Sequence, residues 1–266
     1  MDPALASEYR LEKFKEYGGK PGRATAIEFE QPEREVGSSV HVESLPTIAS
    51  LPKDHFARKY IEDRKIPMFF LDKLYFCETW KALTNQYEPG TYETIWKDEA
   101  RIVIPAYNAD RKLSCFQGRS LDPDVDEKKY LTVKVIDELK LWGLDRAQKN
   151  KPLFLLEGAF DAMFLDNTTA MFGGLMNPED LPVGYDWVFV LDNEPRNLSV
   201  LRRYQQLIKK RAKFVSWLGW PYPYKDVNLC VQNGIDPKDI QRYFECNIVS
   251  GLPAQLQFDK WKKLPL

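Results

Sequence analysis

Three short apolar segments, each followed by acidic residues, are the feature that most constrains the fold of this chain. The segments are Leu153–Leu156, Trp187–Leu191 and Lys213–Leu218. Short apolar runs of this kind are typical of strands buried in a parallel sheet. Helical stretches expected over 159–166 and 197–210 separate them, as in βαβ units. We therefore predict an α/β fold with a parallel sheet flanked by helices.

Acidic residues stand at or just beyond the end of each predicted strand. Glu157 closes the first strand, Asp192 closes the second, and Asp226 follows the third at a short distance. Because the carboxyl ends of parallel strands meet at one edge of a sheet, we expect these carboxylates to lie together. Clustered carboxylates repel one another unless a cation neutralises them, and oxygen ligands favour Mg²⁺ or Mn²⁺. The sequence therefore predicts a divalent-metal site suited to phosphate chemistry.

Further oxygen donors lie at short spacings from the first two acids. Asp161 follows Glu157 by about one helical turn, so both side chains are expected to face one pocket. Glu194 follows Asp192 by two residues, and alternate side chains on an extended turn point the same way. The Asp192–Glu194 pair can therefore contact one cation from two sides.

The third acidic strand end repeats this spacing with one neutral oxygen donor, since Asn228 follows Asp226 by two residues. Lys225 beside them is expected either to bind a phosphate or to screen the acids. A single acid at the start of a helix is often only a cap favoured by the helix dipole, so no residue of this set is diagnostic alone. The coincidence of three acidic strand ends is what favours a metal site.

The length and the net charge limit the classes of protein to which this chain can belong. The chain has 266 residues, enough for one large or two smaller domains, and a formal net charge of −1. No apolar stretch is long enough to cross a bilayer, and the first residues lack the features of a signal peptide. An intracellular location is therefore expected. The charge argues weakly against a generic nucleic-acid coat but leaves room for a local basic track.

The cysteines do not predict a metal site or a disulfide framework. They are widely scattered, without a CxxC pair: Cys77, Cys115, Cys230 and Cys246. A structural zinc site needs closely spaced thiolate or imidazole ligands, so no zinc is predicted. Buried, reduced thiols are the expected state.

The first third of the chain lacks the alternation of apolar strands and helices that is expected in the later part. Residues 1–45 are charged and turn-rich, which is typical of a linker or tail. Apolar residues at helical spacing predict a helix within 52–64, with Asp54 as its cap and Pro67 beyond its end. A second helical stretch is expected near 71–83.

A hairpin is expected after these helices. The segments 101–107 and 112–121 are β-prone, and the turn-like residues Asn108–Arg111 separate them. Two such segments around a short polar turn predict an antiparallel pair of strands.

At this point several segments resemble a known family. Glu157–Asp161 resembles the first signature of the Toprim domain, and Asp192–Glu194 resembles a variant of its second. Segments in the same order as in bacterial replicative primases are Ile104–Arg119, Lys129–Leu131 and Leu141–Leu144. Asp192–Asn197 and Lys225–Asn228 look closest to primase subunits of T-even-type bacteriophages. The resemblance covers about residues 50 to 235.

The resemblance implies a domain organisation. It implies a Toprim fold preceded by a mixed α+β N-terminal subdomain. The expected segments are a linker or tail at 1–45, the primase N-terminal subdomain at 46–150, the Toprim domain at 151–235 and a C-terminal helical tail at 236–266.

The resemblance also implies roles for individual residues. The catalytic residues would be Glu157, Asp192 and Glu194. The ligands of Mg²⁺ or Mn²⁺ would be Glu157, Asp161, Asp192, Glu194, Asp226 and Asn228. Arg119, Lys129 and Lys225 would bind the triphosphate or the template backbone. Two residues depart from the usual Toprim pattern, because Glu194 replaces an Asp and Asn228 replaces an acid.

The implied function is that of a DNA primase catalytic core. Such a core makes short RNA primers on single-stranded DNA by metal-dependent nucleotidyl transfer from ribonucleoside triphosphates. A replicative helicase is the implied partner, and the cytoplasm of a bacterial host is the implied location if the protein is viral. Primases of this type normally begin with a zinc ribbon, whose cysteines are missing here. We therefore expect that module on another chain, or on a part of the protein outside this sequence.

Two other functions stay open at this stage. A Toprim nuclease would keep the acids without needing Arg119 and Lys129. A non-catalytic single-strand binding module would need neither metal nor acids. The aromatic side chains of Trp217, Trp220, Tyr222 and Tyr224 are candidates for stacking on template bases, although packing within the protein is the commoner role.

Overall fold

The computed structural model describes residues 41–91, 98–122, 129–173 and 177–265. Most of the expected linker or tail, residues 1–40, lies outside these ranges. The described residues belong to one compact unit built on two sheets, one of four strands and one of six. None of its described helices is long and apolar enough to cross a membrane.

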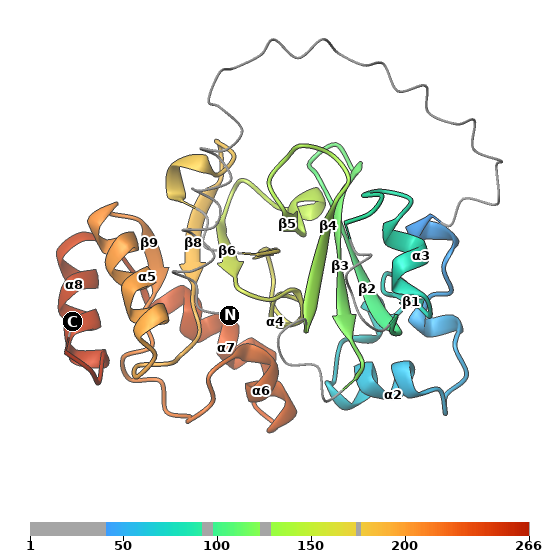
Figure 1. Cartoon of the computed structure of the whole chain (residues 1–266). Helices are drawn as coiled ribbons and strands as arrows, with labels where there is room; N and C mark the ends of the chain where they lie inside the picture. The colour runs from blue at the N-terminus through green and yellow to red at the C-terminus, as the bar shows by residue number, and fades with distance from the viewer. Residues whose placement is uncertain (1–40, 92–97, 123–128, 174–176, 266) are drawn as a thin grey trace, which may run out of the picture. The chain divides into compact units, whose positions relative to one another are not determined.

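The four-stranded sheet is antiparallel throughout and contains the expected hairpin (Figure 1). Its strands, in spatial and chain order, are β1 (Tyr75–Cys77), β2 (Arg101–Tyr107), β3 (Leu113–Ser120) and β4 (Tyr130–Lys134). At the hairpin turn the Asn108 backbone N–H donates to the Lys112 carbonyl over 2.9 Å. The antiparallel pair predicted for 101–107 and 112–121 is therefore confirmed.

Short helices surround this sheet. They are η1 (Val42–Ser44), η2 (Ile48–Ser50), α2 (Phe56–Asp63), η3 (Met68–Phe70) and α3 (Trp80–Thr84). The helix predicted within 52–64 is present, but its cap is His55, whose Nδ1 accepts from the Ala57 N–H over 3.2 Å. Asp54 lies one residue too early to reach the first free N–H groups.

The continuous helical stretch expected near 71–83 is wrong. Tyr75–Cys77 forms β1, which pairs with β2, and only Trp80–Thr84 is helical. The backbone of this segment is extended because the exposed edge of β2 offers it hydrogen-bond partners. Such tertiary pairing overrides the local helical pattern.

The six-stranded sheet has the order β10-β9-β8-β6-β7-β5. Its strands are β5 (Leu141–Trp142), β6 (Pro152–Leu156), β7 (Thr168–Met171), β8 (Asp186–Val190), β9 (Lys213–Val215) and β10 (Ile248–Val249). The four central strands are parallel, and the two edge strands β5 and β10 run antiparallel to their neighbours. The predicted parallel sheet is therefore confirmed, together with the α/β class.

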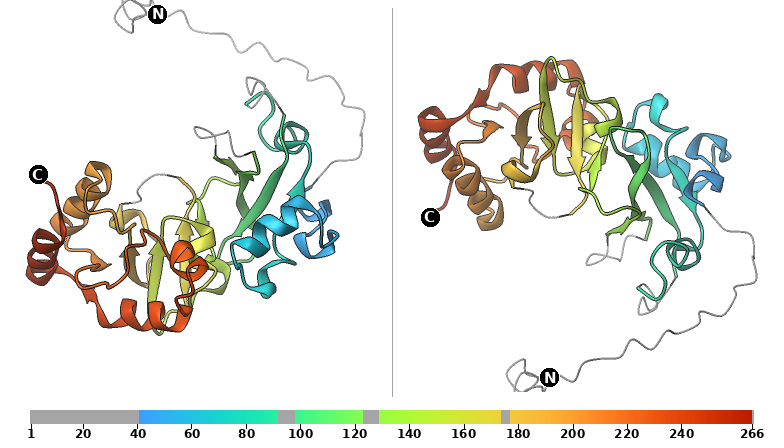
Figure 2. Two further views of the ribbon diagram at one scale, coloured as in Figure 1. Left: turned by 90° about the horizontal axis from the view of Figure 1, so that it is seen from below. Right: turned by 90° about the horizontal axis from the view of Figure 1, so that it is seen from above.

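Helices connect and cover these strands. They are η4 (Leu144–Arg146), α4 (Ala159–Ala162), η5 (Pro178–Asp180), α5 (Leu198–Lys209), α6 (Val227–Gln232), α7 (Pro237–Cys246) and α8 (Gly251–Trp261). Figure 2 shows α5 on one face of the sheet and α7 on the other. The helix expected over 159–166 is only α4, because the chain turns at Asn167 (φ 46°) into β7, a strand not predicted. The helix expected over 197–210 is α5, capped by the Asn197 side chain.

The C-terminal residues join the six-stranded sheet. We expected a helical tail at 236–266, and α7 and α8 are helices. Between them, however, β10 pairs with β9 and extends the sheet past residue 235. The α8 helix packs against α5, where the rings of Tyr204 and Trp261 lie 5.1 Å apart. This segment is therefore structurally part of the sheet that carries the acids.

The side chains flagged in the sequence divide between core and surface. Cys77, Cys115 and Cys230 are buried as expected, but Cys246 is exposed at the end of α7. Trp217 is buried and contacts the rings of Trp220, Tyr243 and Phe244. Packing is therefore the observed role of Trp217. Tyr222 is exposed beside Trp220.

Candidate active site: an acidic cleft between the two sheets

A cleft of about 610 Å³ lies between the two sheets. Its acidic wall carries Glu157, Asp161, Asp192 and Asp226, with Lys225 and Asn228 beside them. Its opposite wall carries Gln117, Arg119, Lys129, Tyr130 and Thr132, and Arg64 also lines it. In this cleft, four carboxylates on one wall therefore face a polar and cationic wall on the other side.

The parallel strands bring the first two acids together. Glu157 follows β6 and Asp192 lies just beyond β8, and β6 pairs with β8 in register. One Glu157 carboxylate oxygen, Oε1, accepts from the Asp192 backbone N–H over 3.1 Å. The other, Oε2, accepts from Arg203 Nη1 over 2.7 Å. Both oxygens of Glu157 thus have a partner, and their orientation is defined.

Asp161 lies beside this pair on the first turn of α4. Its Oδ1 accepts from the Asn228 backbone N–H over 2.8 Å. A Cβ atom at Gly158 would lie 2.8 Å from Asp161 Oδ2, so a side chain there would force that carboxylate to shift. Burial, followed by the charge of Asp226, raises the pKa of Asp161 to about 7.

The loop before α6 brings in the third acid. Asp226 caps α6, since its Oδ1 accepts from the Leu229 N–H over 2.7 Å. The Lys225 carbonyl accepts from the Asn193 N–H over 2.7 Å and so ties this loop to the end of β8. Burial, followed by the charge of Glu157, raises the pKa of Asp192 to about 8. The carboxylates therefore lie close enough for each to oppose the ionisation of the next.

One cation is already placed among these acids. Lys225 Nζ lies 3.8 Å from Asp192 Oδ2 and 3.9 Å from Asp226 Oδ2. Burial lowers the pKa of Lys225, but the charges of Asp192 and Asp226 outweigh it, so the pKa is raised overall. Lys225 therefore offsets part of the negative charge of these acids, which is one of the two roles expected for it.

The two remaining predicted ligands are placed differently. The Asn228 Oδ1 accepts from Arg64 Nη1 over 2.5 Å, and its Nδ2 donates to the Arg64 carbonyl over 2.8 Å. Its amide oxygen is thus committed to Arg64. Glu194 does not line the cleft, and its Oε2 accepts from Asn197 Nδ2 over 3.0 Å. Five of the six expected ligands therefore line one cleft, and four of these are carboxylates.

The opposite wall brings the predicted phosphate-binding residues into the same cleft. The Arg119 guanidinium lies 4.7 Å from the centre of the Tyr130 ring and 5.7 Å from that of Tyr60. Lys129 also lines the cleft and is exposed. These cations come from β3 and the residue just before β4 and face acids from the other sheet.

Three residues of the site were missed by sequence reasoning. Arg64 and Tyr130 line the cleft, and Arg203 holds Glu157 from behind. Arg203 had a detectable signal, because it lies at helical spacing from Val200 and Leu207, both buried. A cation on the inward face of a helix needs an anionic partner.

The donor set suits a hard cation. Within the described ranges, no three acidic, His or Cys side chains already converge at metal-binding distance. The four carboxylates nevertheless line one cleft, and the raised pKa values of Asp161 and Asp192 reflect their burial and mutual repulsion. Oxygen-only donors with excess negative charge fit Mg²⁺ or Mn²⁺.

The parallel sheet with acids at its strand ends defines a Toprim-type core, built for phosphoryl transfer. No family model matches the chain. The DNA primase of enterobacteria phage T4 is 35% identical over 270 residues, which cover 99% of this chain and 77% of that relative. The chain belongs to the DNA primase family. It is therefore a DNA-directed RNA polymerase, with nucleotidyl transfer as its chemistry.

Solved primase structures share the fold. The Escherichia coli primase catalytic core matches with a TM-score of 0.55 at 16% identity, covering 79% of each chain. A DnaG catalytic domain bound to single-stranded DNA matches with a TM-score of 0.54 at 15% identity, covering 75% of this chain and 74% of that one. The Aquifex aeolicus primase, with its zinc-binding and RNA polymerase domains, matches with a TM-score of 0.56 at 18% identity, covering 75% of this chain. This chain spans 57% of that Aquifex structure.

Proposed function

We propose that the acidic cleft is the site at which this primase joins ribonucleotides into a primer. The observation that carries the proposal is the pairing of two walls. Four carboxylates on one wall suit a divalent cation, and Arg119 and Lys129 on the other suit phosphate oxygens. Nucleotidyl transfer needs both, because a polyanionic triphosphate must approach a site that is itself acidic.

Glu157, Asp161, Asp192 and Asp226 would hold Mg²⁺ or Mn²⁺. When bound, the metal supplies positive charge where the attacking 3′-hydroxyl and the leaving pyrophosphate develop negative charge. Glu194, beside the cleft, is assigned to the outer part of this site. Its carboxylate is one of those that raise the pKa of Lys225, which places its charge near that cation.

The protein side chains have separate tasks in this proposal. Glu157, held by Arg203 and by the Asp192 N–H, takes the proton of the attacking hydroxyl or orients that hydroxyl. Arg119 and Lys129 bind phosphate oxygens of the triphosphate or the template, and Lys225 neutralises charge between the acids. Positioning and fixed charge supply most of the catalysis in such reactions.

The proposal extends to partners and location. The template is single-stranded DNA, the substrates are ribonucleoside triphosphates, and a replicative helicase delivers the template. A zinc-ribbon module that selects the start site belongs to another chain or to a part of the protein outside this sequence. The cytoplasm of a bacterial host is where all of these meet.

The test is ribonucleotide incorporation on single-stranded DNA carrying a short annealed primer, with Mg²⁺ or Mn²⁺ added. The annealed primer removes the need for start-site selection. Asp192→Asn is the informative variant. Asp186→Asn is its matched control, because Asp186 lies at the opposite end of the same strand in an exposed ion pair with Lys213.

Extension that needs metal, disappears in Asp192→Asn and survives in Asp186→Asn is the expected result. Metal-dependent cutting of the template without extension would replace the proposal by a Toprim nuclease. DNA binding that needs no metal and survives Asp192→Asn, with no extension in any metal, would replace it by a binding module.

A further inference from the structure

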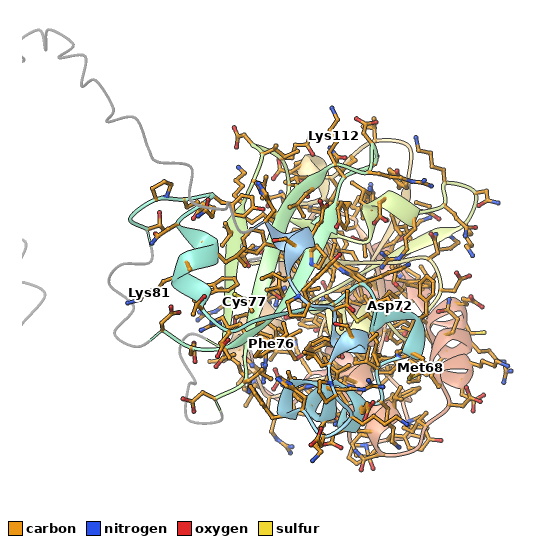
Figure 3. All side chains as sticks on the ribbon, turned by 90° about the vertical axis from the view of Figure 1, so that its right-hand side faces the viewer. Met68, Asp72, Phe76, Cys77, Lys81 and Lys112 are labelled. Atoms are coloured by element: carbon orange, nitrogen blue, oxygen red, sulfur yellow. The ribbon has the colours of Figure 1, made fainter. Side chains whose placement is uncertain are left out.

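A second cavity, of about 230 Å³, lies away from the acidic cleft. It is lined by Phe70, Asp72, Lys73, Leu74, Tyr75, Pro105, Tyr107, Trp142, Asp145, Arg146 and Met163. None of these residues lines the acidic cleft. Figure 3 looks towards this side of the chain, with Asp72 and Met68 close together and Lys112 well apart from them.

The floor of this cavity is apolar. Phe70, Leu74, Trp142 and Met163 are all buried, and the rings of Phe70 and Trp142 lie 5.7 Å apart. The Arg146 guanidinium lies over part of this floor, 4.0 Å from the centre of the Trp142 ring and 5.5 Å from that of the Phe70 ring. A flat, poorly hydrated group such as a nucleobase would therefore stack on the guanidinium face or on the apolar surface beside it.

Two cations stand at the rim. The Arg146 guanidinium lies 4.0 Å above the Trp142 ring, and its ion pair is a long one, 3.5 Å to the adjacent Asp145. Gly143 permits this stacking, because a Cβ there would lie 3.0 Å from Arg146 Nη2. Lys73 Nζ lies 3.4 Å from the centre of the exposed Phe69 ring. No acidic side chain among the described residues forms an ion pair with Lys73.

The two cations act on each other across the cavity. Burial and then the charge of Arg146 lower the pKa of Lys73, while Asp145 raises it by less. Two like charges that face one space are stabilised by an anion placed between them. Two acids, Asp72 and Asp145, also line the cavity and offset part of this positive charge.

We infer that this cavity binds a nucleotide unit, with its phosphate between Lys73 and Arg146 and its base over the apolar floor. The unit is either a free nucleotide or one residue of a single strand. Both present a phosphate next to a planar base. The cavity, at about 230 Å³, holds only part of such a unit, and the rest of the nucleotide projects from the cavity opening.

The site is separate from the catalytic cleft but lies close to it through α4. Asp161 in α4 faces the acidic cleft, and Met163 directly after that helix lines the second cavity. A ligand that contacts Met163 would therefore lie next to the helix that carries Asp161 of the acidic wall. Binding itself does not depend on the proposed nucleotidyl transfer.

The experiment is isothermal titration of the full chain in EDTA with AMP, with the oligonucleotide dT8 and with inorganic phosphate. EDTA leaves the acidic cleft unable to attract phosphates through a metal. The variants are Lys73→Gln, Arg146→Gln and their combination. Lys112→Gln is the matched control, since it removes the same charge from an exposed lysine that does not line the cavity. Arg119→Gln reports any binding in the catalytic cleft.

We expect AMP to bind the wild type and to bind the double variant at least about tenfold more weakly, with Lys112→Gln and Arg119→Gln unchanged. Lys73→Gln alone should also weaken binding, and because Lys73 is exposed this variant should keep the fold. Binding of AMP alone assigns the site to free nucleotides. Tighter binding of dT8 that is weakened in the double variant and unchanged in Arg119→Gln assigns it to single strands.

Three results would overturn the inference. The first is no binding of either AMP or dT8 at millimolar concentration. The second is equal affinity for phosphate and AMP, which would leave the apolar floor without a role. The third is AMP binding that is lost in Arg119→Gln and unchanged in the double variant, which would place the nucleotide in the acidic cleft.

Discussion

The Arg203 guanidinium donates to the Glu157 carboxylate over 2.7 Å, and the two side chains are only 20% and 26% exposed. Arg203 reaches Glu157 from α5, behind the sheet edge, and does not itself line the cleft. Glu157 is thereby held between a side chain on one side and the Asp192 backbone N–H on the other. Arg203 is a positioning residue for the central acid of the proposed site.

Removing that contact should impair catalysis more than folding. Arg203→Met keeps the length of the side chain but leaves Glu157 without its cation, and we expect primer extension to fall by about 10- to 100-fold. Arg203→Lys should recover part of the loss. Arg202→Met, which alters the exposed neighbour, is the control. The measurement is the extension rate against Mg²⁺ concentration, and an unchanged metal dependence in Arg203→Met would contradict the assigned role.

Asp192→Asn should stabilise the metal-free protein. The folded protein raises the pKa of Asp192 to about 8, whereas in the unfolded chain the acid ionises from about pH 4. Ionisation therefore favours unfolding as the pH rises between these values, and the amide removes that cost. At pH 8 in EDTA we expect a gain of about 1 kcal/mol in the free energy of unfolding by urea.

The same substitution should abolish the response to metal. Mn²⁺ binds only the folded site, so it should raise the unfolding midpoint of the wild type. Asp192→Asn should show little or no such rise. A wild type that is insensitive to Mn²⁺, or a variant that responds equally, would mean that Asp192 is not a ligand.

Asn228→Ala should destabilise the protein. Asn228 and Arg64 exchange two hydrogen bonds, of 2.5 and 2.8 Å, which join the residue after α2 to α6. Loss of both leaves partly buried polar groups of Arg64 unsatisfied, and we expect a cost of about 1–3 kcal/mol. Gln232→Ala, which removes an exposed bond from the same helix to Asp63, should cost about 0.5 kcal/mol or less. Similar values for the two variants in urea unfolding would refute this ranking.

Gly158→Ala should displace Asp161. The Gly158 φ of −126° is available to any residue, so the backbone itself is not strained. The added Cβ would nevertheless lie 2.8 Å from Asp161 Oδ2 and force that carboxylate to move. We expect a loss of at least about tenfold in primer extension with near-normal circular dichroism. Full activity would show that the position of Asp161 is not critical.

Much of the fold follows from local pattern. Apolar runs ending in Glu157 and Asp192 predicted adjacent parallel strands, because burial on both faces leaves a continuous apolar segment. The hairpin of β2 and β3 was predictable for a similar reason, since β-prone residues flank a polar turn. The closeness of Glu157 and Asp192 then followed from sheet geometry alone.

The remaining elements depend on partners distant in the chain. The strands β1, β5 and β10 have two or three residues each and exist because a longer strand offers them an edge. A segment that short has no periodicity to detect. The missed β7 and the shortened α4 have the same origin, since Asn167 turns the chain into the sheet.

The sequence by itself determined the kind of chemistry, through oxygen donors at strand ends, and the layered architecture that gathers them. Only the tertiary structure decided which donors are free. The Asn228 amide oxygen accepts a hydrogen bond from Arg64, and Glu194 lies beside the cleft, where it contacts Asn197. One carboxylate oxygen of Glu157 accepts from Arg203. The Arg64–Asn228 and Arg203–Glu157 pairs join residues 164 and 46 positions apart, so packing across the chain chooses these partners and no local spacing encodes them.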